Sequence, residues 1–334
     1  MSTFGKTCSS TLGLCALALV FLSVKSVSAQ TCLTASDMGE APRSALLNTA
    51  KRYFDMAARG DAASLRQNAI PSLAGSFSGI ETAVKDNQSN LSGAQAVPRS
   101  PFLFKAEGTA PIERAEFLCG VFNKSGQTSD SAVFVISNLP PGTYGVVSLD
   151  VAGPKGPYTV SFVLQQQATD WKLGGFYAKP SQVGAHDGKW FAEQARSFKA
   201  KGKLHDAWFY YLEARELLAP VPFMSTLTTD KLYDEMQSVK PADLPPTDLP
   251  TGSKTFKVTE LFPIAMDKDL DLVVKYQSAD VSNTTQAFQD NTAVMKALVT
   301  KYPELRDAFD GIVARAVEPS GRDYGSLLAM KSIK

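Results

Sequence analysis

The sequence predicts an α+β protein, and three observations support this. Residues 41–91 show helical periodicity, residues 112–178 form short β-rich runs between turn residues, and a smaller strand and helix pattern follows a proline-rich segment. Helices that precede a block of strands, without strict alternation, are typical of an antiparallel sheet with helices on one face. The length of 334 residues favours two or three domains.

The first 29 residues have the pattern of a secretory signal peptide. Lys6 precedes an apolar run over residues 12–24, and small residues follow up to Ala29. The run is too short for a permanent membrane helix, and no later stretch approaches the roughly 20 apolar residues that one needs. We therefore expect cleavage near Ala29, a mature chain without a membrane span, and a periplasmic or extracellular location.

The charge composition argues against nucleic acid as a partner. The chain carries 34 basic and 33 acidic side chains, and residues 1–29 contribute two lysines and no acids. A near-neutral mature chain has no excess of cations to neutralise phosphates or to hold an anionic membrane surface. We expect a protein partner or a small apolar ligand, and the oligomeric state stays open.

Two of the four cysteines, Cys32 and Cys119, remain in the mature chain. An oxidising compartment favours a disulfide between them. It would tie the N-terminus to a predicted strand and stabilise the fold by about 3 to 5 kcal/mol through closure of a long loop. The alternative is two free, buried thiols.

Three helices are predicted before the strands. Apolar residues recur at helical spacing over residues 41–59, and Gly60 ends that helix. Two further helices are expected over residues 62–68 and 78–91, and residues 93–101 are expected to form a loop.

Five β-rich runs follow, joined by connections with the Pro, Gly, Asn and Asp that tight turns need. The simplest arrangement is one antiparallel meander. The predicted strands are residues 113–122, 132–137, 143–151, 158–166 and 171–178.

Two segments, RYFDMAARGDAASL (52–65) and YTVSFVLQQQATDWKLGGFYAKP (158–180), resemble members of the NTF2-like superfamily. The resemblance implies an NTF2-like domain over residues 32–180, with a curved sheet around helices as a cone. The mouth of such a cone holds an apolar ligand, an active site or nothing. A competing segment, FVISNLPPGTYGVVSL (134–149), resembles transthyretin-like β-sandwich modules, but such a module would leave the helices unexplained.

Residues 188–219 have the pattern of two amphipathic helices and resemble a tetratricopeptide hairpin. One hairpin does not make a superhelix, so we expect residues 181–239, with a third helix over 229–239, to pack on the preceding domain. Small and aromatic residues occupy the positions of close helix contact: Ala195, Gly202, Ala207, Tyr211 and Ala214.

Residues 240–253 contain four prolines and are predicted to form an extended linker between domains. Residues 254–334 are predicted to form a small β-β-α-β-β domain, with one helix on a four-stranded antiparallel sheet. Asn283 is expected to cap that helix, with Gln286 at the capping-box position. The expected strands are residues 256–262, 270–277, 311–317 and 324–332.

Few residues suggest catalysis. The two histidines, His186 and His205, flank the first hairpin helix, and the adjacent Asp206 suits the first turn of the second. Motifs with a defined mechanism, such as G-x-S-x-G, H-E-x-x-H and the Walker A loop, are absent from the sequence. We therefore assign no catalytic residue and no cofactor.

A short acidic run around Asp267–Lys268 imitates the start of a calcium loop. Leu272 stands where the loop needs a glycine, and Ser278 stands at the twelfth position in place of glutamate. We therefore expect a charged hairpin tip and assign no metal site.

The mouth of the predicted cone is the first candidate binding site. Residues 32–180 contain no histidine, so proton transfer there would depend on a carboxylate such as Asp55 or Asp150, with its pKa raised by burial. Ligand contacts are predicted for Tyr53, Tyr144, Tyr158, Trp171 and Tyr177.

The second candidate is a run of four aromatic residues over 208–211. Four consecutive helical residues cannot all face a core, so we predict an exposed interaction surface at Trp208, Tyr210 and Tyr211. A place in the helix-helix core is the alternative. Burial of both Trp208 and Tyr210 in the chain's own core would contradict the surface hypothesis.

These features predict an exported, non-enzymatic binding or assembly module of the cell envelope. The alternative is a lyase or isomerase that uses the cone pocket. A deep cavity with a carboxylate of strongly shifted pKa would favour the enzyme, and a filled cone with an exposed aromatic face would favour binding.

Overall fold

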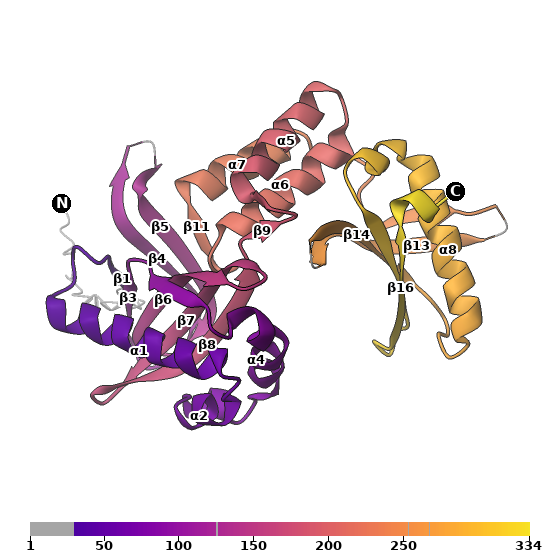
Figure 1. Ribbon diagram of the computed structural model, residues 1–334. Coiled ribbons are helices and arrows are strands. Elements are labelled where there is room, and N and C mark those ends of the chain that lie inside the picture. The colour runs from indigo at the N-terminus through magenta and orange to yellow at the C-terminus, as the bar shows by residue number, and fades with distance from the viewer. Residues whose placement is uncertain (1–29, 125, 253, 267) are drawn as a thin grey trace, which may run out of the picture.

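The computed structural model describes residues 30–124, 126–252, 254–266 and 268–334. The predicted signal peptide and Asp267 lie outside the described residues. The fold is mixed, with helices and largely antiparallel sheets, which confirms the α+β class. Figure 1 shows an N-terminal part of sheet and helices, a group of helices, and a C-terminal sheet with one long helix.

The helices are α1 (Glu40–Ala58), α2 (Ala62–Gln67), α3 (Pro71–Ala74), α4 (Ser78–Leu91), α5 (Gly188–Ala200), α6 (Leu204–Leu218), α7 (Leu227–Gln237) and α8 (Thr284–Lys301), with 3-10 helices η1 (Pro303–Asp307) and η2 (Met330–Ser332). The strands of the N-terminal part are β1 (Gln30–Leu33), β2 (Gln95–Pro98), β3 (Phe102–Ala106), β4 (Ile112–Asn123), β5 (Gly126–Leu139), β6 (Gly142–Gly153), β7 (Gly156–Gln167) and β8 (Asp170–Pro180). The remaining strands are β9 (Gln182–Val183), β10 (His186–Asp187), β11 (Met224–Thr226), β12 (Thr247–Pro250), β13 (Thr255–Met266), β14 (Asp269–Gln277), β15 (Gly311–Val317) and β16 (Asp323–Ala329).

The N-terminal part has three layers. A six-stranded sheet has the order β1-β3-β6-β7-β8, with β2 paired to β6. Helices α1 to α4 pack on one face through a core that includes Leu46, Tyr53 and Phe162. The second sheet, of order β11-β5-β4, packs on the other face through Phe104, Phe117 and other apolar side chains.

Two predictions for this part are wrong. The five predicted strands do not form one meander, because β4 and β5 pair with each other in the second sheet, whereas β6, β7 and β8 are consecutive neighbours in the first. Residues 93–101 are not all loop, because Gln95–Pro98 forms β2 on the edge of β6. Both errors concern pairing between distant segments, which local turn chemistry does not determine.

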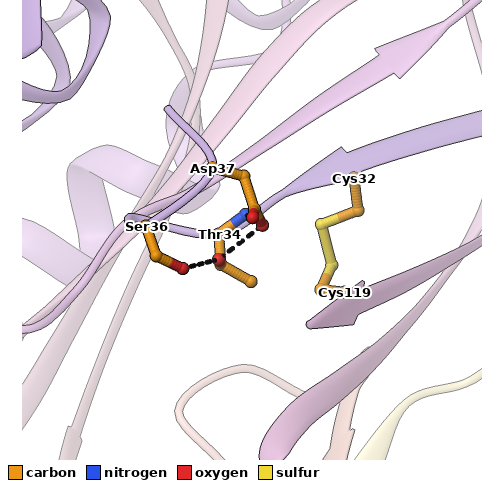
Figure 2. Close-up of a disulfide and its surroundings, with 5 residues drawn as sticks. All are labelled: Cys32, Thr34, Ser36, Asp37 and Cys119. Carbon is orange, nitrogen blue, oxygen red and sulfur yellow. Dashed lines mark hydrogen bonds between the residues drawn. A yellow bond between two sulfur atoms is a disulfide. The ribbon is translucent and has the colours of Figure 1, made fainter. Parts of the chain in front are cut away.

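The predicted disulfide between Cys32 and Cys119 is present and joins the two sheets. Cys32 lies on β1 of the first sheet, and Cys119 lies on β4 of the second, with 5.0 Å between their Cα atoms (Figure 2). The bond therefore connects the two layers on either side of the buried phenylalanine cluster.

Residues after β8 form the helices α5, α6 and α7, and they contact both neighbouring parts of the chain. Strand β11 extends the second sheet by pairing with β5. The same helices share one apolar core with the C-terminal sheet, in which Tyr210 and Phe309 pack together. The segment thus packs on the following part of the chain as well as on the preceding one.

The C-terminal sheet has five strands, in the order β12-β13-β14-β15-β16. The prediction of four antiparallel strands is wrong on two counts. The proline-rich segment contributes β12, and β14 pairs with β15 in parallel. The parallel pair follows from connectivity, because α8 forms a crossover from β14 to β15.

Helix α8 begins where the sequence predicts. Asn283 caps it by accepting a hydrogen bond from the Gln286 backbone N–H at 3.1 Å. The Gln286 side chain does not complete a capping box, since it donates to Asp290 at 2.9 Å. Within the described residues, no helix has the length and apolar character needed to cross a membrane.

Candidate functional site

The five aromatic residues predicted to contact a ligand do not line one pocket. Tyr53 and Trp171 lie on the helix-covered face of the six-stranded sheet, where the Tyr53 hydroxyl donates to the Trp171 carbonyl at 2.8 Å. Tyr144 and Tyr177 face the second sheet on the opposite side. Tyr158 accepts a hydrogen bond from Asn90 at 2.6 Å and lines a separate cavity.

A β-bulge explains why the prediction failed on β8. Trp171 and Tyr177 are six residues apart and would share a face in a regular strand. The register shifts between Val163 and Leu164 of β7, whose partners on β8 are Gly175 and Leu173. The extra residue reverses the alternation of faces, so Trp171 and Tyr177 point to opposite sides of the sheet.

A pocket of about 540 Å³ does exist at the edge of the helix-covered face, and Trp171 is part of it. We call it the mouth pocket. Most of its surroundings are apolar and come from β1, β3, α1 and the start of β8. Its twelve lining residues are Leu33, Met38, Gly39, Ala41, Pro42, Ala45, Leu103, Lys105, Thr143, Gln166, Thr169 and Trp171.

The starting point of α1 explains this pocket. Gly39 is the N-cap of α1, and the helix crosses the sheet at Gly145 of β6, against which Leu46 packs. The next residue on the same face of β6, two positions before Gly145, is Thr143, and it lies beyond the start of α1 together with its neighbours on the adjacent strands. These residues form a row across β3, β6, β7 and β8 on the helix-facing side of the sheet, with Lys105 opposite Thr143 and Gln166 opposite Trp171.

The polar groups of the mouth pocket are few. Lys105 is the one charged residue among the described residues that line it, accompanied by Thr143, Gln166 and Thr169. None of the described residues that line it is a carboxylate or a histidine. The two carboxylates proposed as an acid or base lie elsewhere, since Asp55 and Asp150 are both exposed and Asp150 accepts from Arg99 Nε at 3.0 Å.

A second cluster of polar groups lies where α6 meets η1, and the sequence analysis missed it. The His205 ring nitrogens lie 2.9 Å from Glu304 Oε1 and 3.0 Å from Asp243 Oδ1. Only a doubly protonated imidazole can donate to both carboxylates at once. The Tyr302 hydroxyl also donates to Asp243, at 2.7 Å. The cluster thus joins α6, the proline-rich segment and the end of α8.

Asp206, next to this histidine, is fully buried, and neither carboxylate oxygen has a hydrogen-bond partner among the described residues. Burial raises the pKa of its carboxyl to about 8, with Glu304 and Asp307 adding to the shift and Lys203 opposing it. Burial likewise raises the pKa of Glu213, on the same helix, to about 7. Asp206 and Glu213 are seven residues apart, so both fall on the apolar stripe of α6. This seven-residue spacing is the sequence feature that could have predicted two acids on the buried face of the helix.

The predicted aromatic interaction surface is wrong. Trp208 is 9% exposed, Tyr210 is 7% exposed and Tyr211 is fully buried. The Tyr210 hydroxyl donates to the Ala308 carbonyl at 2.8 Å, and that of Tyr211 donates to Glu235 at 2.9 Å. All four aromatic residues of the run are buried because α6 has neighbours on several sides, namely α5, α7 and the C-terminal sheet.

The C-terminal sheet carries a cleft of about 760 Å³ on the side opposite α8. Its charged side chains are engaged in ion pairs, two of them within the cleft and that of Glu318 with Arg322 beside it. Lys275 lies 3.0 Å from Glu260, and Arg315 Nε donates to Asp323 at 2.6 Å. Because these charged side chains already have partners, the cleft offers a ligand fewer unpaired charges than the mouth pocket does.

Within the described residues, no group of three or more His, Cys, Asp and Glu side chains is arranged to hold a metal ion. No protein-family model, curated protein or solved structure matches the chain. The assignment of a function therefore depends on the geometry of the pockets and clusters described above.

Proposed function

We propose that the protein is an exported binding module whose ligand site is the mouth pocket. The observation that carries this proposal is the start of α1 at Glu40, which leaves one row of the sheet uncovered beside Trp171. The resulting volume of about 540 Å³ lies in the range of small-ligand sites, and the lining is mostly apolar.

The chemistry of the lining favours binding over the lyase or isomerase alternative. General acid–base catalysis needs a group that exchanges protons near the working pH, most often a histidine or a carboxylate. The described lining residues include neither. The carboxylates with raised pKa values, such as Asp206 and Glu213, lie on α6, away from this pocket.

The remaining parts of the proposal concern location and ancestry. Export rests on the signal-like pattern of residues 1–29, and the Cys32–Cys119 bond suits an oxidising compartment. An NTF2-like origin for residues 32–180 is supported by helices that precede antiparallel strands and pack on one face of them. A tetratricopeptide-like origin for 188–219 is supported by the burial of Ala195, Ala207 and Ala214 in the α5–α6 core.

Native mass spectrometry of the protein purified gently from its host's exported fraction tests this proposal. We expect a reproducible small-mass adduct that is lost on denaturation. Ala41→Phe places a ring in the pocket from an exposed position of α1 and should abolish the adduct. Ala63→Phe makes the same change on exposed α2, outside the pocket, and should retain it.

The proposal fails if the chain carries no adduct, or if both variants retain it equally. A bare chain that copurifies with another protein would instead favour the assembly role. Both variants should unfold at the same denaturant concentration as the parent, because each new ring starts from an exposed site.

A further inference from the structure

We infer that the ligand of the mouth pocket is an amphipathic anion, with its apolar chain on the pocket floor and its head group at Lys105. This inference rests on the proposed function, since it names the class of ligand for the same site. The inference follows from the arrangement of the lining, in which apolar side chains such as Leu103 form the floor and Lys105 lies two residues farther along the same strand.

The floor of the pocket is suited to an apolar chain. Leu33 of β1 pairs in register with Leu103 of β3, which is 5% exposed, and Met38 is 7% exposed beside them. Trp171, which is 7% exposed, closes the far side. Leu33 is partly exposed and Ala41 is exposed, so a ligand that covers them gains about 25 cal/mol for each Å² of apolar surface removed from water.

Among the described residues, the rim of the pocket carries one cation. Lys105 is two residues beyond Leu103 on the same strand, so both side chains lie on the helix-covered face. The ion pairs formed by described residues of this part of the chain involve other cations, namely Arg43, Arg99, Arg114 and Lys179. Lys105 is therefore available to a ligand head group, with Thr143 opposite it as a further hydrogen-bond donor.

Two acids near the start of α1 are already engaged within the chain. Asp37 accepts hydrogen bonds from the backbone N–H and the hydroxyl of Thr34, as Figure 2 shows for the side chains. Glu40 interacts with Arg43 and accepts from Ser44 at 2.7 Å. Neither acid lines the pocket, so the charge that a bound ligand meets at the rim is that of Lys105.

The test compares three probes with the same apolar chain in isothermal titration calorimetry: dodecanoate, 1-dodecanol and dodecyltrimethylammonium, each below its solubility limit and critical micelle concentration. We expect dodecanoate to bind more tightly than either of the others. Raised salt should weaken dodecanoate binding and leave dodecanol unaffected, because the head group contact is exposed to solvent.

Lys105→Gln should raise the Kd for dodecanoate about twofold to fivefold, as expected for one exposed ion pair, and leave that for dodecanol unchanged. Lys51→Gln, an exposed lysine farther along α1, is the matched control and should change neither. Equal affinity for dodecanol and dodecanoate, or an unchanged Kd in Lys105→Gln, overturns the inference while leaving the pocket as a site. Failure of all three probes also overturns it, and the adduct experiment separately decides whether the pocket binds anything.

Discussion

Leu46 of α1 packs directly onto the backbone of Gly145 in β6. Both residues are buried, and a Cβ at position 145 would overlap the Leu46 side chain. The glycine thus sets the height of α1 above the sheet. Because Thr143 of the mouth pocket lies two residues away on the same strand, this contact also fixes where the covered part of the sheet ends.

Gly145→Ala should displace α1 from the sheet. The Leu46 side chain is itself fully buried and can move only against its core neighbours, so we expect the free energy of unfolding to fall by about 1 to 3 kcal/mol. Gly174→Ala on β8 is the matched control, because the nearest atom to its new Cβ would be the Val163 carbonyl oxygen at 3.5 Å. Chemical denaturation measures both. An equal loss in the two variants would show that the Leu46 contact is not responsible.

The disulfide should account for a large share of stability. Cys32 and Cys119 are 87 residues apart, and closing a loop of this length in the unfolded chain stabilises a fold by about 3 to 5 kcal/mol in the chain-entropy model. A Cys32→Ser, Cys119→Ser double variant should unfold at a lower denaturant concentration than the oxidised parent. Reduction of the parent should give the same shift, and the reductant should leave the double variant unchanged. Two alkylatable thiols in the native parent would refute the bond.

Local signals predicted the long elements well. The helix expected over residues 41–59 is Glu40–Ala58, and the strand expected over 311–317 is Gly311–Val317. Each has a clear apolar period and a turn or cap residue at its end, so the pattern alone is sufficient. The strands that the sequence analysis missed are short, such as β2 and β12, and exist because a distant edge accepts them. Proline within both segments favoured loop or linker by local rules, and edge pairing tolerates it.

The candidate site was predicted less well than the fold. Trp171, a predicted ligand contact, lines the mouth pocket, but Lys105 was not singled out, since its strand was not predicted. The relation between the two depends on the register of four strands. Similarly, the His205 cluster joins groups about one hundred residues apart. A sequence pattern indicates which residues share a face of a helix or strand. Which distant residues come together depends on how the helices and strands then pair and pack.

Asn291 is a fully buried amide that ties α8 to the C-terminal sheet. It accepts from the Tyr276 hydroxyl at 2.7 Å and donates to Ser326 Oγ at 2.9 Å. Asn291→Leu should lower the free energy of unfolding by about 2 to 4 kcal/mol, because it leaves buried polar groups without partners. Adding Tyr276→Phe should recover part of that loss, since the stranded hydroxyl is removed. Additive losses in the double variant would indicate that the two side chains are not coupled.

Asp206 should make the protein less stable as the pH rises from acid to mildly alkaline. Its folded pKa is about 8, against an ordinary value of 3.8, so between these values the folded state holds a proton that the unfolded state has released. The free energy of unfolding then falls by up to about 1.4 kcal/mol per pH unit, which amounts to about 2 to 3 kcal/mol between about pH 6 and pH 8. The stabilising proton is lost as the pH passes the folded pKa.

Asp206→Asn tests this directly, because an amide has the shape of the protonated carboxyl and does not titrate. Denaturant unfolding across this pH range should show a clearly shallower decline in the variant, with a residual slope from Glu213, whose folded pKa of about 7 acts in the same direction. Asp55→Asn makes the same chemical change at an exposed site on α1 and should decline in parallel with the parent. If the stability of Asp206→Asn declined in parallel with that of the parent, the Asp206 carboxyl would have to be ionised in the folded state as well as in the unfolded state. That would require a partner for its charge in the folded protein. The unpartnered environment of its two oxygens argues against such pairing.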